Sequence, residues 1–482
     1  MAAEGGKAEN GGSVGSLEAN HLKTLPMGTE DAVGRDMRVR QHLIGKIQGV
    51  FERFGFEPHD TPIIENEDVF RGHYGKIESS TFRLEDRNGN ALLLRPDLTV
   101  PLARVVASHP DLPMPYRRYQ IGLSFRDGDG ENFHPRQFTQ CDADVVGSDS
   151  RIIDAEFIML AIAGLMELGF GPLADSGPAN SAPDFIIRIN HRGIFRDIAS
   201  LNGPADEKKI LRIQRAVSKF KGRNYRDVKD DLLDHDIESN IIDVILKVIA
   251  LNGNPAYVLD QITRIKHMDH RGVAFTELSE ICDALLKLPY GLRDKVKIDL
   301  SLVREFNYYS GFVMEGIVTK VTGEESNKKI VPAGDYVLAG GRYDGLIGKF
   351  GAKSQPAAGM TFELENIIRI MKEFGMLDSI DVSRRRILLS CGDKTFLSRL
   401  LAISNDLRAD ALEVVTVSES RPRVDDSLAK EAASLGCPVL VYVDGMVSVK
   451  RVSVPGFDGT QLYERVKKIL TQGNKVAVKE LD

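Results

Sequence analysis

The feature that most constrains the fold is the order in which the spacing of apolar residues changes along the chain. Short extended runs separated by turn residues occupy much of the region between about residues 56 and 146. Helical spacing dominates from about 195 to 290, and strand patterns resume near Lys297. Strands on both sides of a helical stretch predict one sheet-containing domain that carries a mostly helical insertion.

Two pairs of extended runs predict that the sheet is antiparallel. In TFRLEDRNGNALLLRP, apolar runs flank the turn Arg87–Asn90, and in the segment Tyr116–Gly147 two longer runs flank the Gly/Asp-rich loop Asp127–Pro135. Such pairs are typical of β-hairpins. Apolar residues at helical spacing in Asp36–Phe54, and the apolar run Ile153–Leu168, predict helices beside the sheet. The predicted fold class is therefore α+β.

The chain of 482 residues is too long for one hydrophobic core, which rarely serves more than about 250–300 residues. Its first residues are rich in Gly, Ala and Ser, and from Arg386 strands and helices alternate over about 95 residues. We therefore predict a disordered tail at 1–21, a main domain in two parts at 22–195 and 295–378, a helical insertion at 196–294 and a terminal α/β domain at 384–482.

Composition excludes several classes of protein. With 42% hydrophobic residues the chain is not wholly disordered, and a formal net charge of −6 gives no overall basic field for nucleic acid. No apolar stretch reaches the roughly 18 residues of a membrane span, and the N-terminus lacks a secretory signal pattern. The four cysteines form no CxxC pair and the histidines show no metal-ligand spacing, which predicts a cytoplasmic protein without a metal site.

Three short segments carry candidate binding residues. Arg126 stands at the mouth of the Gly/Asp-rich loop, where a guanidinium could hold a phosphate or carboxylate, or could be an ordinary hairpin residue. Asp97 and Thr99 would share one side of an extended segment and could bind an ammonium group. The alternative for these two residues is a turn and a helix cap. Arg304 precedes two tyrosines that could line a pocket or simply pack in a sheet.

Taken together and in this order, LRPDLTVPLAR, the loop hairpin, REFNYYSG and LAGGRYDGL resemble the catalytic core of class II histidyl-tRNA synthetases. They also resemble its paralogue, the regulatory subunit of ATP phosphoribosyltransferase. The resemblance runs from about Leu22 to Phe374, and more loosely to the end of the chain. It implies a six- or seven-stranded antiparallel sheet flanked by helices, a C-terminal anticodon-binding-like α/β domain, and a homodimer formed by the early helix and the strand containing Thr61 and Pro62.

The resemblance also implies a pocket for L-histidine. In this pocket Asp97 and Thr99 would hold the amino group, and Arg126 and Gln140 would lie on the carboxylate side. Asp144, Tyr308 and Tyr309 would surround the imidazole ring. Arg304 matches the arginine that is specific to the histidine enzymes. Carboxylates and phenols are suitable hydrogen-bond partners for an imidazole.

The chain departs from the synthetase pattern where the nucleotide would bind. Gly128 stands where the second class motif has a glutamate after its arginine. In the third class motif Glu363 stands in place of a glycine and Asn366 in place of the arginine that contacts adenine and γ-phosphate. Arg369, almost one helical turn further on, is a candidate to replace that arginine by reaching back.

These departures lead to three hypotheses about function. The leading one is a non-catalytic, histidine-binding regulatory subunit that partners a short-form ATP phosphoribosyltransferase in histidine biosynthesis and needs no cofactor. The alternative is a histidine–tRNA ligase that uses ATP and Mg²⁺ and binds tRNA, with Arg126 and Arg304 as its catalytic residues. The third is a synthetase-derived adaptor that binds RNA through the terminal domain.

Overall fold

A computed structural model describes most of the 482-residue chain. The described residues are 24–71, 80–128, 135–171, 183–220, 224–266, 272–287, 289–304, 308–322, 329–332, 336–382, 386–417, 424–454, 457–473 and 478–481. The tail predicted at 1–21 and most of the Gly/Asp-rich loop lie outside these residues. Contacts within the chain divide it into two compact units, residues 1–380 and 381–482, and each is described by itself.

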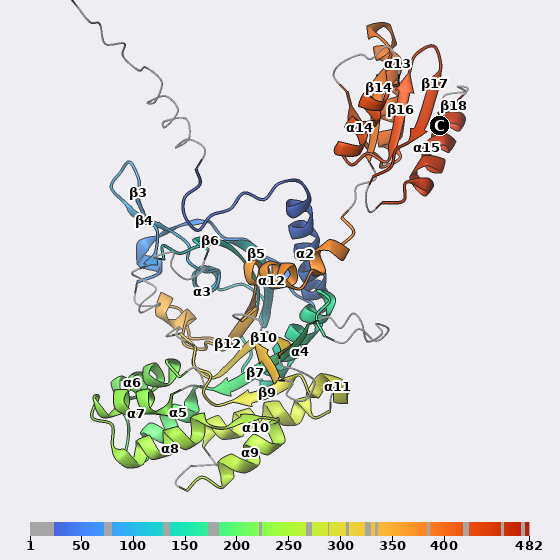
Figure 1. Ribbon diagram of the computed structural model, residues 1–482. Helices are drawn as coiled ribbons and strands as arrows, with labels where there is room; N and C mark the ends of the chain where they lie inside the picture. The colour runs from blue at the N-terminus through green and yellow to red at the C-terminus, as the bar shows by residue number, and fades with distance from the viewer. Residues whose placement is uncertain are drawn as a thin grey trace, which may run out of the picture. The chain divides into compact units, whose positions relative to one another are not determined.

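The first unit is built on a large sheet whose six central strands are antiparallel (Figure 1). In spatial order these strands are β5 (Tyr116–Phe125), β6 (Gln137–Val146), β13 (Ala357–Glu363), β12 (Leu338–Arg342), β10 (Phe312–Thr322) and β7 (Asp184–His191). This confirms the mixed fold with a central sheet and flanking helices. Shorter strands bring the sheet to ten, which is more than the six or seven expected.

The additional strands extend the sheet at its edges. They are β1 (Glu57–Pro58), parallel to β5; β9 (Val296–Asp299), parallel to β7; β8 (Asn252–Gly253), antiparallel to β9; and β11 (Lys329–Pro332), antiparallel to β10. A separate small sheet contains β2 (Ile64–Asn66), β4 (Ala91–Leu94) and β3 (Arg83–Glu85). β3 and β4 form the hairpin whose turn the sequence places at Arg87–Asn90.

Helices cover the large sheet because each has an apolar stripe to bury. α2 (Gly34–Arg53) buries Leu43, Ile47 and Phe51 and packs against α4 (Arg151–Glu167). α12 (Leu364–Glu373) follows β13 directly and packs against β6. Short 3₁₀ turns connect these elements at η1 (Glu67–Val69), η3 (Ile347–Phe350) and η4 (Met376–Ser379).

The stretch between β7 and β9 is helical, as the spacing of its apolar residues indicates (Figure 1, green). Its α10 packs against both α4 and β7, so the helical stretch is joined to the main sheet by side-chain packing as well as by the chain. The helices are α5 (Gly193–Ala199), α6 (Glu207–Ser218), α7 (Tyr225–Leu233), α8 (Ser239–Ile249), α9 (Pro255–Thr263), α10 (Val273–Leu285) and α11 (Tyr290–Arg293).

The second unit is a five-stranded sheet with helices packed on it. Its elements are β14 (Arg386–Cys391), η5 (Lys394–Phe396), α13 (Leu397–Ala409), β15 (Glu413–Thr416), α14 (Asp426–Ser434), β16 (Val439–Val443), β17 (Val447–Arg451), α15 (Thr460–Gly473) and β18 (Val478–Leu481). The sequence pattern missed β18, a parallel neighbour of β17. The reason is that VKEL is too short and too polar to predict a strand on its own.

One local expectation is wrong. The segment around Asp97 and Thr99 is not extended, because Thr99 begins helix α3 (Thr99–Ser108). The Asp97 Oδ1 atom accepts hydrogen bonds from the backbone N–H groups of Thr99 and Val100, both at 3.1 Å. Asp97 therefore caps the helix, as the alternative interpretation of the sequence predicted. Among the described residues, no helix is long and apolar enough to cross a membrane.

Candidate active site

A cleft over the central strands brings the predicted site residues together. We call it the central cleft, and its free space, counted together with the open solvent at its mouth, is about 450 Å³. All eight residues of the predicted histidine pocket line it, although their role in binding histidine stays a prediction. The complete lining is Asp97, Thr99, Arg126, Gln140, Asp142, Asp144, Arg304, Tyr308, Tyr309, Tyr336, Ala339, Tyr343, Gly359, Met360, Thr361 and Glu363.

The floor of the cleft requires residues without side chains. A Cβ atom on Gly359 would lie 1.9 Å from the Asp144 Oδ1 atom, and one on Gly340 would lie 2.4 Å from the Gly359 carbonyl oxygen. Gly359 on β13 therefore leaves room for the Asp144 side chain, and Gly340 lets the backbone of β12 come close to that of β13. The double glycine in LAGGRYDGL marks this close approach of one backbone to another.

Asp144 is held from two sides at the bottom of the cleft. The Tyr343 hydroxyl donates a hydrogen bond to its Oδ1 atom, and the Arg118 Nη2 atom lies 2.8 Å from its Oδ2 atom. Arg118 is completely buried and also donates to the Leu98 carbonyl oxygen at 3.0 Å. Burial raises the pKa of the Asp144 carboxyl, and Arg118 opposes that rise. Asp144 is thus positioned by a hydrogen bond at Oδ1 and an ion pair at Oδ2.

Arg304 is fixed before any ligand arrives. Its Nη1 atom donates to the Glu315 Oε1 atom at 2.6 Å, and its guanidinium lies 4.6 Å from the centre of the Tyr336 ring. Burial opposes its charge, but Tyr336 and Glu315 outweigh that effect and raise the pKa of Arg304. Arg304 therefore stays a preorganised cation at one wall of the cleft.

The paired tyrosines are hydrogen-bond donors at neutral pH. The rings of Tyr308 and Tyr309 lie 4.9 Å apart, and both line the cleft. Burial raises the pKa of Tyr309 to about 12 and that of Tyr308 well above its usual value. Both phenols consequently keep their protons and can donate to a ring nitrogen or a carboxylate.

Arg126 lies at the outer end of the cleft. Its Nε atom donates to the Pro96 carbonyl oxygen at 3.2 Å, and its guanidinium lies 4.8 Å from the centre of the Phe138 ring. These contacts hold the guanidinium at the lining of the cleft. Glu363 lines the same cleft, and burial raises the pKa of its carboxyl while Arg126 lowers it.

The structure does not support Arg369 as a replacement for the missing arginine. Arg369 is exposed on α12 and does not line the central cleft. Asn366 is also outside the lining, and its Nδ2 atom donates to the Tyr336 carbonyl oxygen at 3.0 Å. The reason is the direction of α12, which carries residues beyond Glu363 away from the cleft floor.

Several lining residues escaped the sequence analysis. Asp142 alternates with Gln140 and Asp144 along β6, and period-two spacing could have placed all three on one face. Tyr343 follows the double glycine, and only the fold shows that its hydroxyl reaches Asp144. For Tyr336 and Thr361, no sequence signal identified a role.

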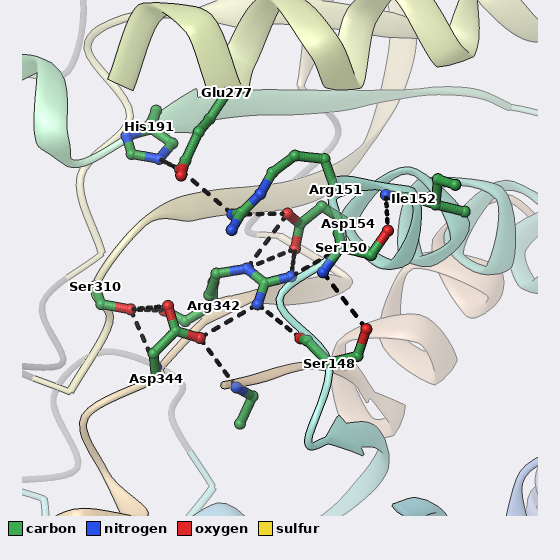
Figure 2. Close-up of polar contacts among 11 residues, drawn as sticks. Ser148, Ser150, Arg151, Ile152, Asp154, His191, Glu277, Ser310, Arg342 and Asp344 are labelled. Carbon is green, nitrogen blue, oxygen red and sulfur yellow. Dashed lines mark hydrogen bonds and ion pairs between the residues drawn. The ribbon is translucent and has the colours of Figure 1, made fainter. Parts of the chain in front are cut away.

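A network of charged and polar side chains, buried at its centre, adjoins the segments that carry the cleft tyrosines (Figure 2). Its centre is Arg342, which adjoins the lining residue Tyr343 and whose Nη2 atom lies 2.9 Å from the Asp154 Oδ1 atom. Arg151 Nη1 lies 3.3 Å from both the Asp154 Oδ2 and the Glu277 Oε2 atoms. Because Glu277 belongs to α10, the network connects the helical stretch with the cleft-bearing sheet.

The network reaches one residue further and ends at a histidine. The His191 Nε2 atom lies 2.8 Å from the Glu277 Oε2 atom, and this hydrogen bond lowers the pKa of the Glu277 carboxyl. On the other side, Asp344 accepts from Arg342 Nη1 at 3.2 Å, and its backbone N–H donates to the Ser310 hydroxyl at 3.1 Å. Ser310 directly follows Tyr308 and Tyr309, and Arg342 directly precedes Tyr343. The network therefore contacts both chain segments that carry the cleft tyrosines.

An antiparallel six-stranded centre, flanking helices and a cleft lined in this way define a class II synthetase fold. The family model for histidyl-tRNA synthetase matches residues 28–367. A histidine–tRNA ligase of Aeropyrum pernix is 31% identical over 464 residues, which cover 92% of this chain and 98% of the relative. The chain belongs to the histidyl-tRNA synthetase family.

Solved structures agree with the fold. Histidyl-tRNA synthetase from Nostoc sp. PCC 7120 superposes with a TM-score of 0.70 at 24% identity, covering 92% of this chain and 99% of that one. A protein from Bacillus halodurans described as an ATP phosphoribosyltransferase regulatory subunit/histidyl-tRNA synthetase has a TM-score of 0.66 at 22% identity, covering 88% and 98%.

The leading functional hypothesis from the sequence is wrong. Relatives that are 28–31% identical are named histidine–tRNA ligase. The structure described as a regulatory subunit/histidyl-tRNA synthetase is 22% identical and shows the fold alone. Gly128, Glu363 and Asn366 misled the interpretation because it gave three local departures more weight than the similarity of the whole chain. The expectations of a transferase partner and of no cofactor rested on the same hypothesis.

Proposed function

We propose that the protein is a histidine–tRNA ligase, which activates histidine with ATP and transfers it to tRNA. The observation that carries the proposal is the convergence of all eight predicted pocket residues on one cleft. The similarity of nearly the whole chain to ligases supports it. The named relatives also make tRNA the proposed partner of this chain.

The cleft residues suit the two ends of a histidine molecule. Asp97 and Thr99 offer a carboxylate and a hydroxyl to the ammonium group, and Arg126 offers a guanidinium to the carboxylate. At the other end, Asp144 and the two tyrosines would surround the ring. Because Asp97 and Asp144 are each held by protein hydrogen bonds, they are positioned before the ligand binds.

In the activation step, an oxygen of the histidine carboxylate attacks the α-phosphorus of ATP and pyrophosphate leaves. Arg126 would stabilise the negative charge that develops on the α-phosphoryl group, since it lines the cleft and is already oriented. No cluster of three metal ligands occurs among the described residues. Mg²⁺ would therefore bind mainly through the triphosphate and screen its charge.

Pyrophosphate exchange into ATP tests the proposal directly. We expect the purified chain, supplied with ATP and Mg²⁺, to exchange labelled pyrophosphate only when L-histidine is present. A calorimetric titration with histidine on the same preparation shows whether the protein is folded and competent to bind. Histidine binding without exchange would exclude the ligase, and the absence of both would exclude the histidine site as well.

Glu363 is expected to weaken the binding of ATP. Two like charges about 4 Å apart cost about 4 kcal/mol at an effective dielectric of about 20, before neighbouring cations compensate. Replacing Glu363 by glutamine should therefore lower the KM for ATP by about tenfold or more, while histidine affinity stays unchanged. Steady-state exchange at varied ATP measures this KM.

The matched control is Glu280→Gln, because Glu280 is exposed on α10 and does not line the cleft. Glu280→Gln should leave both the KM for ATP and the affinity for histidine unchanged. An unchanged KM for ATP in Glu363→Gln would show that the Glu363 carboxyl is neutral, or is turned away from the triphosphate, when ATP binds.

The protein is proposed to act as a homodimer. A groove formed by α2, β5 and the segment between β1 and β2 coincides with the surface that the resemblance assigns to the dimer. Ile63 and Ile64 on this surface are 41% and 52% exposed, an unusual position for two neighbouring isoleucines unless a partner covers them. A second copy of the chain would bury both.

Replacing Ile63 by glutamate should therefore dissociate the dimer. We expect the dissociation constant to rise about ten- to a hundredfold, because a carboxylate would be buried without a partner. Sedimentation velocity over a concentration series measures the change. Ile152→Glu is the control, since Ile152 is 71% exposed at the start of α4 and away from the groove. A wild-type chain that stays monomeric would contradict the dimer itself.

A further inference from the structure

Three aspartates line the central cleft, and one of them has no assigned role. Asp142 and Asp144 are two residues apart on β6, so their side chains share one face of the sheet, and Asp97 lies opposite at the start of α3. Asp142 is 2% exposed. A completely buried carboxyl in a binding cleft requires an explanation.

The other two aspartates each have an oxygen that accepts hydrogen bonds from the protein. Asp144 is bound by Tyr343 and Arg118, and Asp97 Oδ1 accepts from two backbone N–H groups of α3. The Oδ1 atom of Asp142 is buried and has no hydrogen-bond partner in the part of the chain that the structure describes, whereas the Oδ2 atom of Asp144, which also accepts no hydrogen bond there, is ion-paired with Arg118. Asp142 thus lines the cleft with an acceptor to spare for a ligand.

Asp142 lies on the side of the cleft where the ring of histidine is proposed to bind. Its charge raises the pKa values of both Tyr308 and Tyr309, after the larger effect of burial. The same two tyrosines belong to the proposed ring pocket. An imidazole ring placed between them and Asp144 would present its second nitrogen to a neighbouring acceptor.

We propose that Asp142 accepts a hydrogen bond from the second ring N–H of bound histidine, so that the cleft selects the imidazolium form of the amino acid. This inference rests on the proposed histidine site. A neutral imidazole has a single N–H, whereas the imidazolium has two. Asp144 and Asp142 therefore take one N–H each, and the ring charge compensates the buried pair of carboxylates.

The charges around Asp142 come from every element that packs on it and decide whether a cation is favoured. Asp144 and Asp97 add negative charge to that of Asp142, and two buried arginines, Arg118 on β5 and Arg95 before α3, supply positive charge. Arg304 forms an ion pair with Glu315, and the positive charge of Arg126 acts on the Glu363 carboxyl, whose pKa it lowers against the larger effect of burial. The remaining titratable groups of the cleft are the phenols of Tyr308, Tyr309, Tyr336 and Tyr343. The balance at the ring end is therefore negative, which favours a cationic ligand.

The ring protonation of bound histidine can be observed without any variant. Histidine labelled with ¹⁵N on the ring is bound to the full-length wild-type chain at pH 7.5, where free histidine is mostly neutral. We expect both ring nitrogens to resonate in the protonated range. One protonated and one unprotonated nitrogen in the bound ring would overturn the proposal, while absence of binding would remove the histidine site on which it rests.

A competing amino acid tests the role of Asp142 itself. Triazolylalanine has nearly the shape of histidine, but its ring stays neutral at pH 7. By calorimetry, the wild type should bind histidine about ten- to a hundredfold tighter than triazolylalanine, as expected for a charge-assisted hydrogen bond. Asp142→Asn should reduce this preference to about threefold or less, because an amide has no charge to favour the cation.

The control for the variant is Asp260→Asn, the same exchange on the exposed surface of α9. It should keep the wild-type preference. Asp142→Asn with an unchanged preference would overturn the role of Asp142 even if histidine binds. Circular dichroism of each variant verifies that it is folded, and the ¹⁵N result on the wild type decides the question if Asp142→Asn does not fold.

Discussion

Replacing Asp154 by asparagine is expected to lower the free energy of unfolding of the first unit by about 3–5 kcal/mol, because the buried Arg342 loses its buried partner and keeps only the 40% exposed Asp344. The side chains of Arg342 and Asp154 are 1% and 0% exposed. Because asparagine has nearly the same volume as aspartate, the decrease in the free energy of unfolding would come from the lost charge and not from a cavity. Amide hydrogen exchange in β12 and β6 measures this local free energy.

Two further variants make the test specific. Asp260→Asn breaks the exposed Arg264–Asp260 pair and should cost less than about 1 kcal/mol, because water already solvates both charges. The double variant Asp154→Leu/Arg342→Met removes both charges and should recover much of the loss. A single-variant loss below about 1 kcal/mol would show that water or another carboxylate, such as Asp344, compensates the charge of Arg342.

Because the same network supports Tyr343 and Ser310, the Asp154 variant should also affect the cleft. Weaker histidine binding by Asp154→Asn at a temperature where the protein remains folded would show that the network positions the tyrosines of the cleft. Normal histidine binding by this variant would limit the network to a structural role.

Replacing Arg126 by alanine is expected to reduce histidine-dependent pyrophosphate exchange by about 10²–10³-fold, the usual loss when one preorganised donor to a developing charge is removed. Arg126→Lys should recover only part of the rate, since an ammonium cannot bind an anion in bidentate fashion. Exchange rates at saturating histidine and ATP separate the loss of rate from the loss of affinity.

The control for this experiment is Arg226→Ala. Arg226 is 86% exposed on α7 and its nearest acid is Asp230 at 3.7 Å, so its loss removes one positive charge without touching the cleft. Exchange should be unaffected. An Arg126→Ala variant that exchanges at the wild-type rate would mean that another cation contacts the α-phosphate, and Arg304 would be the first candidate.

The elements that follow from short-range patterns could be predicted from the sequence. The helix at Gly34–Arg53, the β3–β4 hairpin and the helical stretch after β7 each depend on spacing within a few residues, which the sequence displays directly. The pocket residues came from the resemblance to a family. Their convergence on one cleft could not be derived from spacing, because Asp97 and Glu363 are far apart in the chain.

The sequence by itself thus determined the class of fold, the order of helices and strands, and the residue types of the cleft. Only the tertiary structure decided which of those residues are already engaged. Asp144 is bound by Tyr343, 199 residues further along the chain, whereas its neighbour Asp142 keeps a buried oxygen without a partner among the described residues. Periodicity reports which face a side chain occupies, but hydrogen bonding depends on contacts between distant segments, and those exist only in the folded chain.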